Sequence, residues 1–341
     1  MSEVVHDALA RPLRSLRLSV TDRCNLRCAY CMPEESYTWL PRTDLLDFDE
    51  LTRIARVATD LGVTRLRLTG GEPLLRRELP ALVARLVRLT GIKEAALTTN
   101  GILLPDLARD LASAGLARLT VSLDTLSPTR FHALTRVDEH ARVLGGIEAA
   151  REVGLPLKLD TVVVRGVNDD ELVPLLEFAA THGAELRFIE YMDVGGATRW
   201  SPERVVSRSE ILARIGVGFG KIATVGGRGS APAELFELPG GQRFGVIASV
   251  TAPFCATCDR GRLTADGQWL SCLYARRGLD LKAPLRSGAS DEELRAILAS
   301  AWRQRHDRGA EERQALPDRE PLVPLTSLRR DPHLEMHTRG G

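Results

Sequence analysis

The stretch LRLSVTDRCNLRCAYC, residues 16–31, contains the features that decide the fold class and the chemistry. Its first part alternates apolar and polar residues, a period of two that predicts a β-strand over residues 15–20. Directly after it come Cys24, Cys28 and Cys31 in a C-x₃-C-x₂-C pattern. Thiolates bind iron–sulfur clusters, and a cubane cluster normally takes a full set of four cysteines. Three cysteines would leave one iron open for a small molecule, so we predict a strand that leads into such a site.

The first two thirds of the chain alternate short apolar strands with amphipathic helical patterns, which is typical of βαβ units around a parallel sheet. After Gly195 this alternation stops. Six strands predict an α/β fold, a partial (βα)6 TIM-like barrel that falls short of the eight strands of a closed one. The predicted strands are 15–20, 65–69, 94–99, 118–123, 157–164 and 186–191, and the predicted helices are 48–62, 78–91, 104–115, 170–183 and 289–305.

Polar side chains alternate with apolar ones along these strands, and the apolar ones should pack under the helices. The other face would then point into the barrel. Because an unpaired buried charge costs several kcal/mol, the barrel should be wet, heavily self-paired or occupied by a polar ligand. Strands that lie flat with their polar face in water remain an alternative, and the sixth strand is ambiguous. The inward set is Ser15, Arg17, Ser19, Arg65, Arg67, Thr69, Ala96, Thr98, Thr120, Ser122, Asp124, Lys158 and Asp160.

A second cysteine group lies in the C-terminal region, residues 221–341, which follows the barrel of residues 10–220. Cys255, Cys258 and Cys272 form a C-x₂-C-x₁₃-C pattern that also lacks an obvious fourth ligand. Between them lies Arg260-Gly261-Arg262, and the planar fork of arginine suits phosphate and carboxylate oxygens. A structural zinc site is an alternative if histidine completes a trio. The candidates are His6, in a terminus expected to be mobile, and the distant His306, His333 and His337.

Composition describes an ordinary globular protein, with 44% hydrophobic residues and a net charge of +1. With no basic excess, we expect no nucleic-acid binding. We expect no membrane span, because no apolar run is long enough. The N-terminus lacks a secretory signal, so we expect a cytoplasmic location in which thiols stay reduced. In that setting six cysteines in two groups favour metal binding over disulfides.

The first cysteine pattern, with Tyr30 inside it, resembles the radical S-adenosylmethionine (SAM) superfamily, and TGGEP over residues 69–73 resembles its glycine-rich motif. Nearly end to end, the chain resembles the MoaA family, the GTP 3′,8-cyclases of molybdenum cofactor biosynthesis. The discriminating parts are C-x₂-C-R-x-R and the terminal Gly340-Gly341, while Arg339 stands where the family more often has an apolar residue. The other matching segments are LRLSVTDRCNLRCAYCMP, LRLTGGEPLLR, LTTNG, RLTVSLDTL, RGVND and RFIEYMDVG.

The resemblance implies a lyase with two [4Fe–4S] clusters and SAM. It would convert GTP to (8S)-3′,8-cyclo-7,8-dihydroguanosine 5′-triphosphate, the first step of molybdenum cofactor biosynthesis. In such enzymes a 5′-deoxyadenosyl radical abstracts the ribose 3′ hydrogen of GTP. The implied partners are an electron donor and the downstream enzyme MoaC, and a homodimer is compatible with the resemblance. Two other functions remain open, a peptide-modifying radical SAM enzyme with an auxiliary cluster and a zinc-binding module.

The resemblance also implies a role for each matching residue. The first cluster would be held by Cys24, Cys28 and Cys31, and the second by Cys255, Cys258 and Cys272. SAM would contact Tyr30, Gly71, Glu72, Ser122 and Met192. GTP would contact Arg17, Arg67, Thr98, Lys158, Arg187, Arg260, Gly261 and Arg262. Arg17, Arg260, Arg262, Gly340 and Gly341 are the implied catalytic residues.

Overall fold

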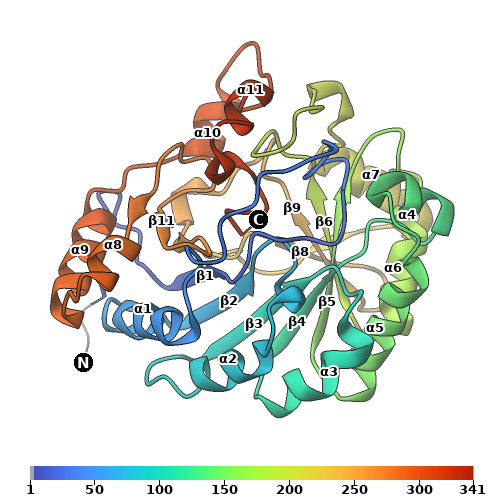
Figure 1. The fold of residues 1–341 in the computed structure, drawn as a ribbon. Coiled ribbons are helices and arrows are strands. Elements are labelled where there is room, and N and C mark those ends of the chain that lie inside the picture. Colours follow the sequence, from blue (N-terminus) through green and yellow to red (C-terminus); the bar gives the residue numbers. More distant parts are fainter. Residues whose placement is uncertain (1–3, 341) are drawn as a thin grey trace.

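The computed structural model describes residues 4–340, and within them the strands form one twelve-stranded sheet that curves around an interior (Figure 1). Its middle is the predicted set of six parallel strands, each paired with the next along the chain. The prediction of a partial barrel is therefore confirmed. These strands are β1 (Ser15–Ser19), β2 (Arg65–Thr69), β3 (Glu94–Thr99), β4 (Arg118–Ser122), β5 (Leu157–Val163) and β6 (Glu185–Glu190).

Helices cover the outer face of this sheet (Figure 1), and the core lies between the two layers. Leu16 and Leu18 of β1 point into it and are completely buried, as the alternation predicts. The helices are α1 (Phe48–Asp60), α2 (Leu79–Leu86), α3 (Leu104–Ser113), α4 (Pro128–Thr135), α5 (His140–Glu152), α6 (Leu172–Thr181), α7 (Arg208–Phe219), α8 (Lys282–Arg286), α9 (Asp291–Arg303), α10 (Gly309–Gln314) and α11 (Leu325–Leu328).

The alternation of strands and helices does not stop after Gly195, and that expectation was wrong. Helix α7 follows β6, and its first turn is closed by a capping box between Ser207 and Glu210. Such a box, a serine followed three residues later by glutamate, marks a helix start in the sequence. The predicted helix over 78–91 is also too long, because α2 ends at Leu86.

The C-terminal region continues both edges of the sheet. Strand β9 (Arg243–Ile247) pairs in parallel with β6, and β10 (Arg260–Leu263) pairs in parallel with β1. The parallel part thus has two strands more than the six predicted, because it takes one at each edge from a distant segment. Antiparallel strands complete the edges, namely β7 (Ala223–Thr224), β8 (Glu234–Glu237), β11 (Gln268–Leu270) and β12 (Leu279–Asp280). A domain boundary at residue 220 stays a prediction.

The N-terminal segment is packed, which corrects the expectation of a mobile terminus there. Val5 and Asp7 are buried, and the Val5 N–H donates to the Leu61 carbonyl oxygen after α1. His6 pairs with Pro12 as an isolated bridge and is itself exposed. Segments at both ends of the chain thus help to enclose the barrel.

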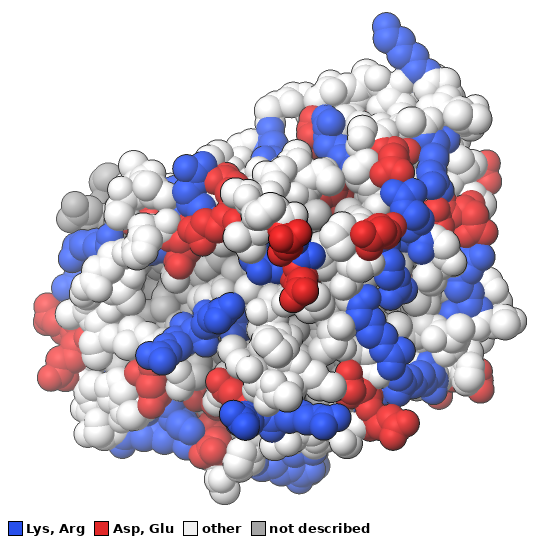
Figure 2. Space-filling view, turned by 90° about the horizontal axis from the view of Figure 1, so that it is seen from above, with Lys and Arg blue, Asp and Glu red and all other residues white. Residues whose placement is uncertain are grey.

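The surface carries mixed charge. Figure 2 shows Lys and Arg interspersed with Asp and Glu over the face seen from above, without a field of one sign. This agrees with the net charge of +1. Among residues 4–340, no helix combines the length and the apolar character that crossing a membrane requires.

Candidate active site

A cavity of about 680 Å³ runs through the interior of the curved sheet, and both cysteine trios line it. Most of the predicted inward set lines the cavity as well, so the alternative of strands lying flat in water is excluded. The barrel is polar inside rather than packed with aliphatic side chains. The predicted inward residues on the cavity wall are Ser15, Arg17, Arg65, Arg67, Thr69, Thr98, Ser122, Asp124 and Asp160.

The glycine-rich turn after β2 packs directly on the first cysteine loop. The Gly71 N–H donates to the Thr21 carbonyl at 2.9 Å, and the Glu72 N–H donates to the Arg23 carbonyl at 2.7 Å. A Cβ on Gly71 would lie 2.3 Å from the Arg23 carbonyl oxygen, so no side chain fits there. The close approach is to the chain's own cysteine loop, which explains why the two motifs occur together.

The residues predicted to contact SAM all line the cavity with the first cysteine trio; they are Tyr30, Gly71, Glu72, Ser122 and Met192. The Glu72 carboxylate accepts hydrogen bonds from the Leu74 and Asn100 N–H groups, at 2.9 and 2.7 Å. It also accepts one from the Thr99 hydroxyl at 2.7 Å. Burial raises the pKa of Glu72 to about 7, although these donors act against the shift. Glu72 therefore fastens the turn after β2 to the end of β3.

Tyr30 is held by a carboxylate on the opposite wall. Its hydroxyl donates to Asp124 Oδ2 at 2.7 Å, and the Val162 N–H donates to Asp124 Oδ1 at 2.8 Å. Burial raises the pKa of Asp124 to about 6, while the hydrogen bond from Tyr30 lowers it. This contact fixes the aromatic ring inside the first cysteine loop against β4 and β5.

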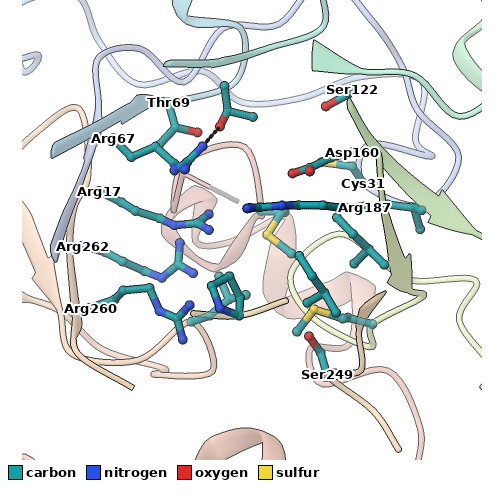
Figure 3. Close-up of a pocket in the computed structure, with 18 of the residues that line it drawn as sticks. Arg17, Cys31, Arg67, Thr69, Ser122, Asp160, Arg187, Ser249, Arg260 and Arg262 are labelled. Atoms are coloured by element: carbon teal, nitrogen blue, oxygen red, sulfur yellow. Dashed lines mark hydrogen bonds between the residues drawn. The ribbon is translucent and has the colours of Figure 1, made fainter. Parts of the chain in front are cut away.

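A row of arginines crosses the three neighbouring strands β10, β1 and β2, which form another wall of the cavity. The register aligns Arg262 of β10 with Arg17 of β1, and Arg17 with Arg67 of β2. Figure 3 shows these three guanidinium groups, with that of Arg260, projecting from one side of the cavity. Neighbouring strands lie about 4.8 Å apart, so like charges are held close together. Arg67 donates to the Thr98 and Thr120 hydroxyls at 3.0 and 3.1 Å, which are neutral oxygens. The charges of Asp160 and Glu94 compensate that of Arg67 only in part.

The arginine row lowers the pKa of its own members. Burial, followed by the charges of Arg262 and Arg67, lowers the pKa of Arg17 well below its ordinary value. Burial and the charge of Arg260 lower the pKa of Arg262 to about 10. A lowered arginine pKa means that the folded protein disfavours the positive charge. A polyanion bound there would relieve the repulsion, so the row is suited to several phosphate groups.

Arg187 and Asp160 face the row from the opposite wall (Figure 3). Burial raises the pKa of Asp160, while the charges of Arg187 and Arg67 lower it. Glu185 accepts from both Lys158 Nζ and Arg187 Nε, at 2.6 and 2.8 Å. Lys158 lies at the start of β5 and is not among the residues that line the cavity. Its predicted contact with GTP stays a prediction.

The second cysteine trio lies beside the arginine row. Cys255 and Cys258 precede β10, and Cys272 follows β11. Burial raises the pKa of Cys258, but the charges of Arg260 and Arg305 outweigh it and lower the pKa to about 6. The Tyr274 N–H donates to Cys272 Sγ at 3.4 Å. The Cys258 thiolate is thus favoured, which is the form that binds metal.

The C-terminal tail enters the cavity from the same side. Arg262 Nη1 donates to the Gly340 carbonyl at 2.7 Å, and Arg17 Nη1 donates to the same oxygen at 3.4 Å. A Cβ on Gly340 would lie 2.5 Å from Thr69 Cγ2, and its φ of 64° also favours glycine. Arg339 is buried and donates to the carbonyls of Leu273 and Ala275. Arg339 therefore anchors the tail. Gly341 lies outside the described residues.

Gly261 is placed differently from its two neighbours. It lies between Arg260 and Arg262 in β10, but it faces away from the cavity, toward Trp269. A Cβ on Gly261 would lie 2.3 Å from Trp269 Cη2, so glycine is needed for this packing. Its predicted contact with GTP stays a prediction, and its clear structural role is to seat β10.

Several residues on the cavity wall were missing from the predicted site. Arg118 has the parity of an inward residue on β4, so the alternation could have found it. Glu94 has the same inward parity on β3. A further group lies in irregular segments where no periodicity exists to indicate their direction. They include Asn100, Arg228, Ser249, Phe254, Tyr274, Met336 and His337.

The donor chemistry fits iron–sulfur clusters. Three thiols of each trio face one cavity, and the thiolates of a cluster bind separate irons. Within residues 4–340, no three His, Cys, Asp or Glu side chains are gathered as ligands of a single metal ion. All six cysteines are free of disulfides. The first trio, Gly71 and Glu72 would hold a cluster with SAM, and the second trio would hold another cluster.

Comparison with known proteins gives the same picture. Residues 18–179 match the Radical SAM superfamily, and residues 184–311 match Molybdenum Cofactor Synthesis C. "GTP 3′,8-cyclase 3" of Mycobacterium bovis is 52% identical, covering 99% of this chain and 90% of the relative. "GTP 3′,8-cyclase" of Staphylococcus aureus is 43% identical, covering 92% and 95%. Streptococcus suis SuiB bound to S-adenosylmethionine has a similar fold, with a TM-score of 0.58, 19% identity, and 84% of this chain and 68% of that chain covered.

Proposed function

Because this chain belongs to the GTP 3′,8-cyclase family of radical SAM enzymes, we propose that its two cysteine trios and its arginine row serve one reaction in the cavity between them. That reaction converts GTP to (8S)-3′,8-cyclo-7,8-dihydroguanosine 5′-triphosphate, the first step of molybdenum cofactor biosynthesis. The observation that carries the residue assignments is that both trios and the row line the same cavity. The zinc-module alternative is set aside by the family, and full-length cyclase relatives favour GTP over a peptide substrate.

The first trio forms the radical-generating end of the site. Cys24, Cys28 and Cys31 would hold one [4Fe–4S] cluster, and Gly71 and Glu72 would border the SAM bound to it. When bound, this cluster and SAM supply the 5′-deoxyadenosyl radical that removes the ribose 3′ hydrogen. The chain's own contribution is to fix the geometry. The hydrogen bonds from the Gly71 and Glu72 N–H groups to the cysteine loop keep the two motifs in one arrangement.

The arginine row forms the GTP-binding end. Arg17, Arg67 and Arg262 would bind the triphosphate, since a polyanion neutralises charges that otherwise repel. Arg260, Arg187 and Thr98 would complete the binding surface. The row contacts the tail at the Gly340 carbonyl. The proposed catalytic residues are therefore Arg17, Arg260, Arg262 and the tail glycines. The second trio would hold the other cluster beside the bound nucleotide.

The proposal is tested by separating the two ends of the site. Anaerobic turnover with GTP, SAM and dithionite should yield 5′-deoxyadenosine and a cyclised nucleotide. Cys24→Ser should abolish both products, because a hydroxyl is a poor ligand for iron. Cys272→Ser should reduce the iron content from about eight to about four per chain. It should also retain part of the 5′-deoxyadenosine while cyclisation fails.

Equal loss of both products in the two variants would contradict this division of labour. A matched control is Ser287→Ala, an exposed serine outside the cavity lining. It should keep the iron of both clusters.

We also propose an electron donor and a downstream enzyme such as MoaC as partners, because the reaction needs an electron and its product is an intermediate. A homodimer is proposed as the assembly. The cytoplasm is the proposed location, and the six free cysteines suit its reducing conditions.

A further inference from the structure

A buried group of charges lies behind the second cysteine trio. Asp7 comes from the N-terminal segment, Arg11 precedes β1, and Arg305 follows α9. Their exposed fractions are 7%, 2% and 3%. Asp7 Oδ2 accepts from Arg11 Nε at 2.6 Å and from Arg305 Nη1 at 3.2 Å. We name these three residues the Asp7 triad.

Both arginines of the Asp7 triad also hold the backbone of the cysteine loop. Arg11 Nη1 donates to the Cys255 carbonyl oxygen at 2.9 Å. Arg305 Nη1 donates to the Cys258 carbonyl oxygen at 2.8 Å. Two cysteines of one trio are thus each held by a guanidinium, and both guanidinium groups are joined through a single carboxylate.

The third cysteine is reached through a neighbouring residue. Arg11 Nη1 donates to the Asp307 carbonyl oxygen at 2.8 Å, and the Ser271 hydroxyl donates to Asp307 Oδ2 at 2.5 Å. Ser271 directly precedes Cys272. The segments that carry all three cysteines therefore converge on the Asp7 triad.

Neighbouring residues hold the side chains of the triad in place. Trp302 Nε1 donates to the Arg11 carbonyl at 3.1 Å, and the Arg305 guanidinium lies 4.5 Å from the centre of the Trp302 ring. The Ala8 N–H donates to the Arg305 carbonyl at 3.1 Å. Because these contacts hold Arg11 and Arg305 in place, the two arginines can fix the loop that carries Cys255 and Cys258.

Charged groups whose only role is to stabilise the fold would not need to be two buried arginines and one buried aspartate. Replacing a buried ion cluster with apolar residues is often neutral or stabilising. The triad has two positive charges and one negative charge, and Asp307 Oδ2, which lies 3.9 Å from Arg305 Nε, balances the group as a whole. The positive charge nearest the cysteines is nevertheless that of the two guanidinium groups, because these donate directly to the Cys255 and Cys258 carbonyl oxygens. Outer-shell groups and nearby charge set the affinity of a metal centre and the reduction potential of an iron–sulfur cluster.

We propose that Asp7, Arg11 and Arg305 are positioning residues for the second cluster, which fix the spacing of Cys255 and Cys258 and supply positive charge that raises its reduction potential. This rests on the proposed function, in which the second trio holds a cluster. The first trio has no comparable group, since Arg27 Nη1 donates to the Cys24 carbonyl without a buried carboxylate partner among the described residues. The triad thus distinguishes the two clusters.

The test uses the full chain with Cys24→Ala, Cys28→Ala and Cys31→Ala as the parent, so that only the second cluster can form. Arg305→Met and Arg305→Lys are added to it separately. The matched control is Arg295→Met, on helix α9 that leads to Arg305, where the side chain is 49% exposed and pairs with Glu292. Two quantities are measured: the rate of iron loss to a chelator, and the midpoint potential from a redox titration followed by electron paramagnetic resonance.

Arg305→Met should lose iron about tenfold faster than the control and should show a lower midpoint potential. Arg305→Lys should also lose iron faster, because an ammonium lacks the planar fork, but its potential should stay near that of the parent because the charge is kept. If Arg305→Met fails to fold, Arg305→Lys decides through its rate of iron loss.

Two results would overturn the proposal in different ways. Iron loss and potential equal to those of Arg295→Met would show that the triad only anchors the N-terminal segment. A parent without any iron–sulfur cluster would instead contradict the proposed function on which the triad depends.

Discussion

At the scale of single residues, the site places charges where they weaken the folded protein. Arg67 contacts two threonine hydroxyls rather than a carboxylate. Burial, followed by the charge of Arg118, lowers the pKa of Arg67 to about 10, so its positive charge is disfavoured in the free protein. The arrangement is explained by a ligand that carries the opposite charge. Function and stability therefore make opposite demands on this residue.

Arg67→Met tests this conflict. The affinity for GTP should fall about ten- to a hundredfold, because a charge-assisted contact is lost. The affinity for SAM should not change. The thermal unfolding midpoint should stay the same or rise, because a disfavoured charge is removed. Calorimetric titration and a melting curve measure these effects, with exposed Arg85→Met as the control. A lower melting temperature with unchanged GTP affinity would contradict the assigned role.

At the scale of elements, strand β10 joins the two halves of the site. It places Arg260 and Arg262 on the cavity wall directly after two cysteines of the second trio, and it enters the sheet in parallel next to β1. The position of β10 in the sheet depends on Gly261, because the Trp269 ring of β11 packs directly over this glycine. The arginine row therefore depends on a contact on the opposite face of the sheet.

Gly261→Ala should displace β10. The new methyl group would overlap the Trp269 ring, and overpacking of this kind costs about 1–3 kcal/mol. We expect a lower unfolding midpoint and weaker GTP binding together. Adding Trp269→Leu should restore part of both, because the smaller side chain leaves room. Gly227→Ala is the control, since nothing lies within 4 Å of the added carbon. An unchanged unfolding midpoint in Gly261→Ala would show that β10 and Trp269 can shift to make room for the methyl group.

At the scale of the whole molecule, the C-terminal tail connects the two ends of the cavity. Met336 and His337 lie on the wall with the first trio, and Gly340 reaches the arginine row. His337 packs edge-on against Tyr37 and Trp39 and is 2% exposed. Burial, followed by the charge of Arg27, lowers the pKa of His337 to about 3. The docked tail therefore requires a neutral imidazole.

Acid should weaken the part of the docking that His337 contributes. A histidine in the undocked tail titrates near pH 6.5, whereas docked His337 titrates near pH 3. At His337 the undocked state thus binds more protons between these values, so the His337 contribution to docking is lost as the pH falls below about 6.5 and is fully present above it. Glu335 acts in the opposite direction, because burial in the docked tail raises its pKa to about 7, so the His337 contribution is read from the difference between the chain and a variant that lacks the imidazole. At about pH 5.5 the shift corresponds to about tenfold in the docking equilibrium. Hydrogen exchange of residues 335–340, corrected for intrinsic rates, measures it.

His337→Phe should lose the His337 part of the pH dependence, because phenylalanine can pack against the same two rings without a titrating group, and its docking should therefore weaken less in acid than that of the unchanged chain. His306→Phe is the control, since His306 is an exposed histidine away from the cavity. It should keep the dependence. An equal pH response in both variants would exclude His337 as the cause.

The sequence by itself determined the six central strands, which face of each strand points into the barrel, and the two cysteine trios. These features depend on local periodicity and on residue chemistry, which a single chain displays directly. Arg17, Arg67 and Ser122 were placed on the inner wall by alternation alone, and the structure agrees. Thiol spacing and a matching family gave the cofactors. Such properties do not depend on what lies next to a segment in space.

Only the tertiary structure decided what joins the edges of the barrel and what fills its opening. The pairing of β10 with β1 brings residues more than 240 positions apart into register, and no periodicity indicates such a partner. The buried N-terminal segment and the docked tail are irregular, so their direction is set by distant contacts such as those of Arg11 and Arg339. The physical reason is that burial of an irregular segment depends on surfaces formed elsewhere in the chain.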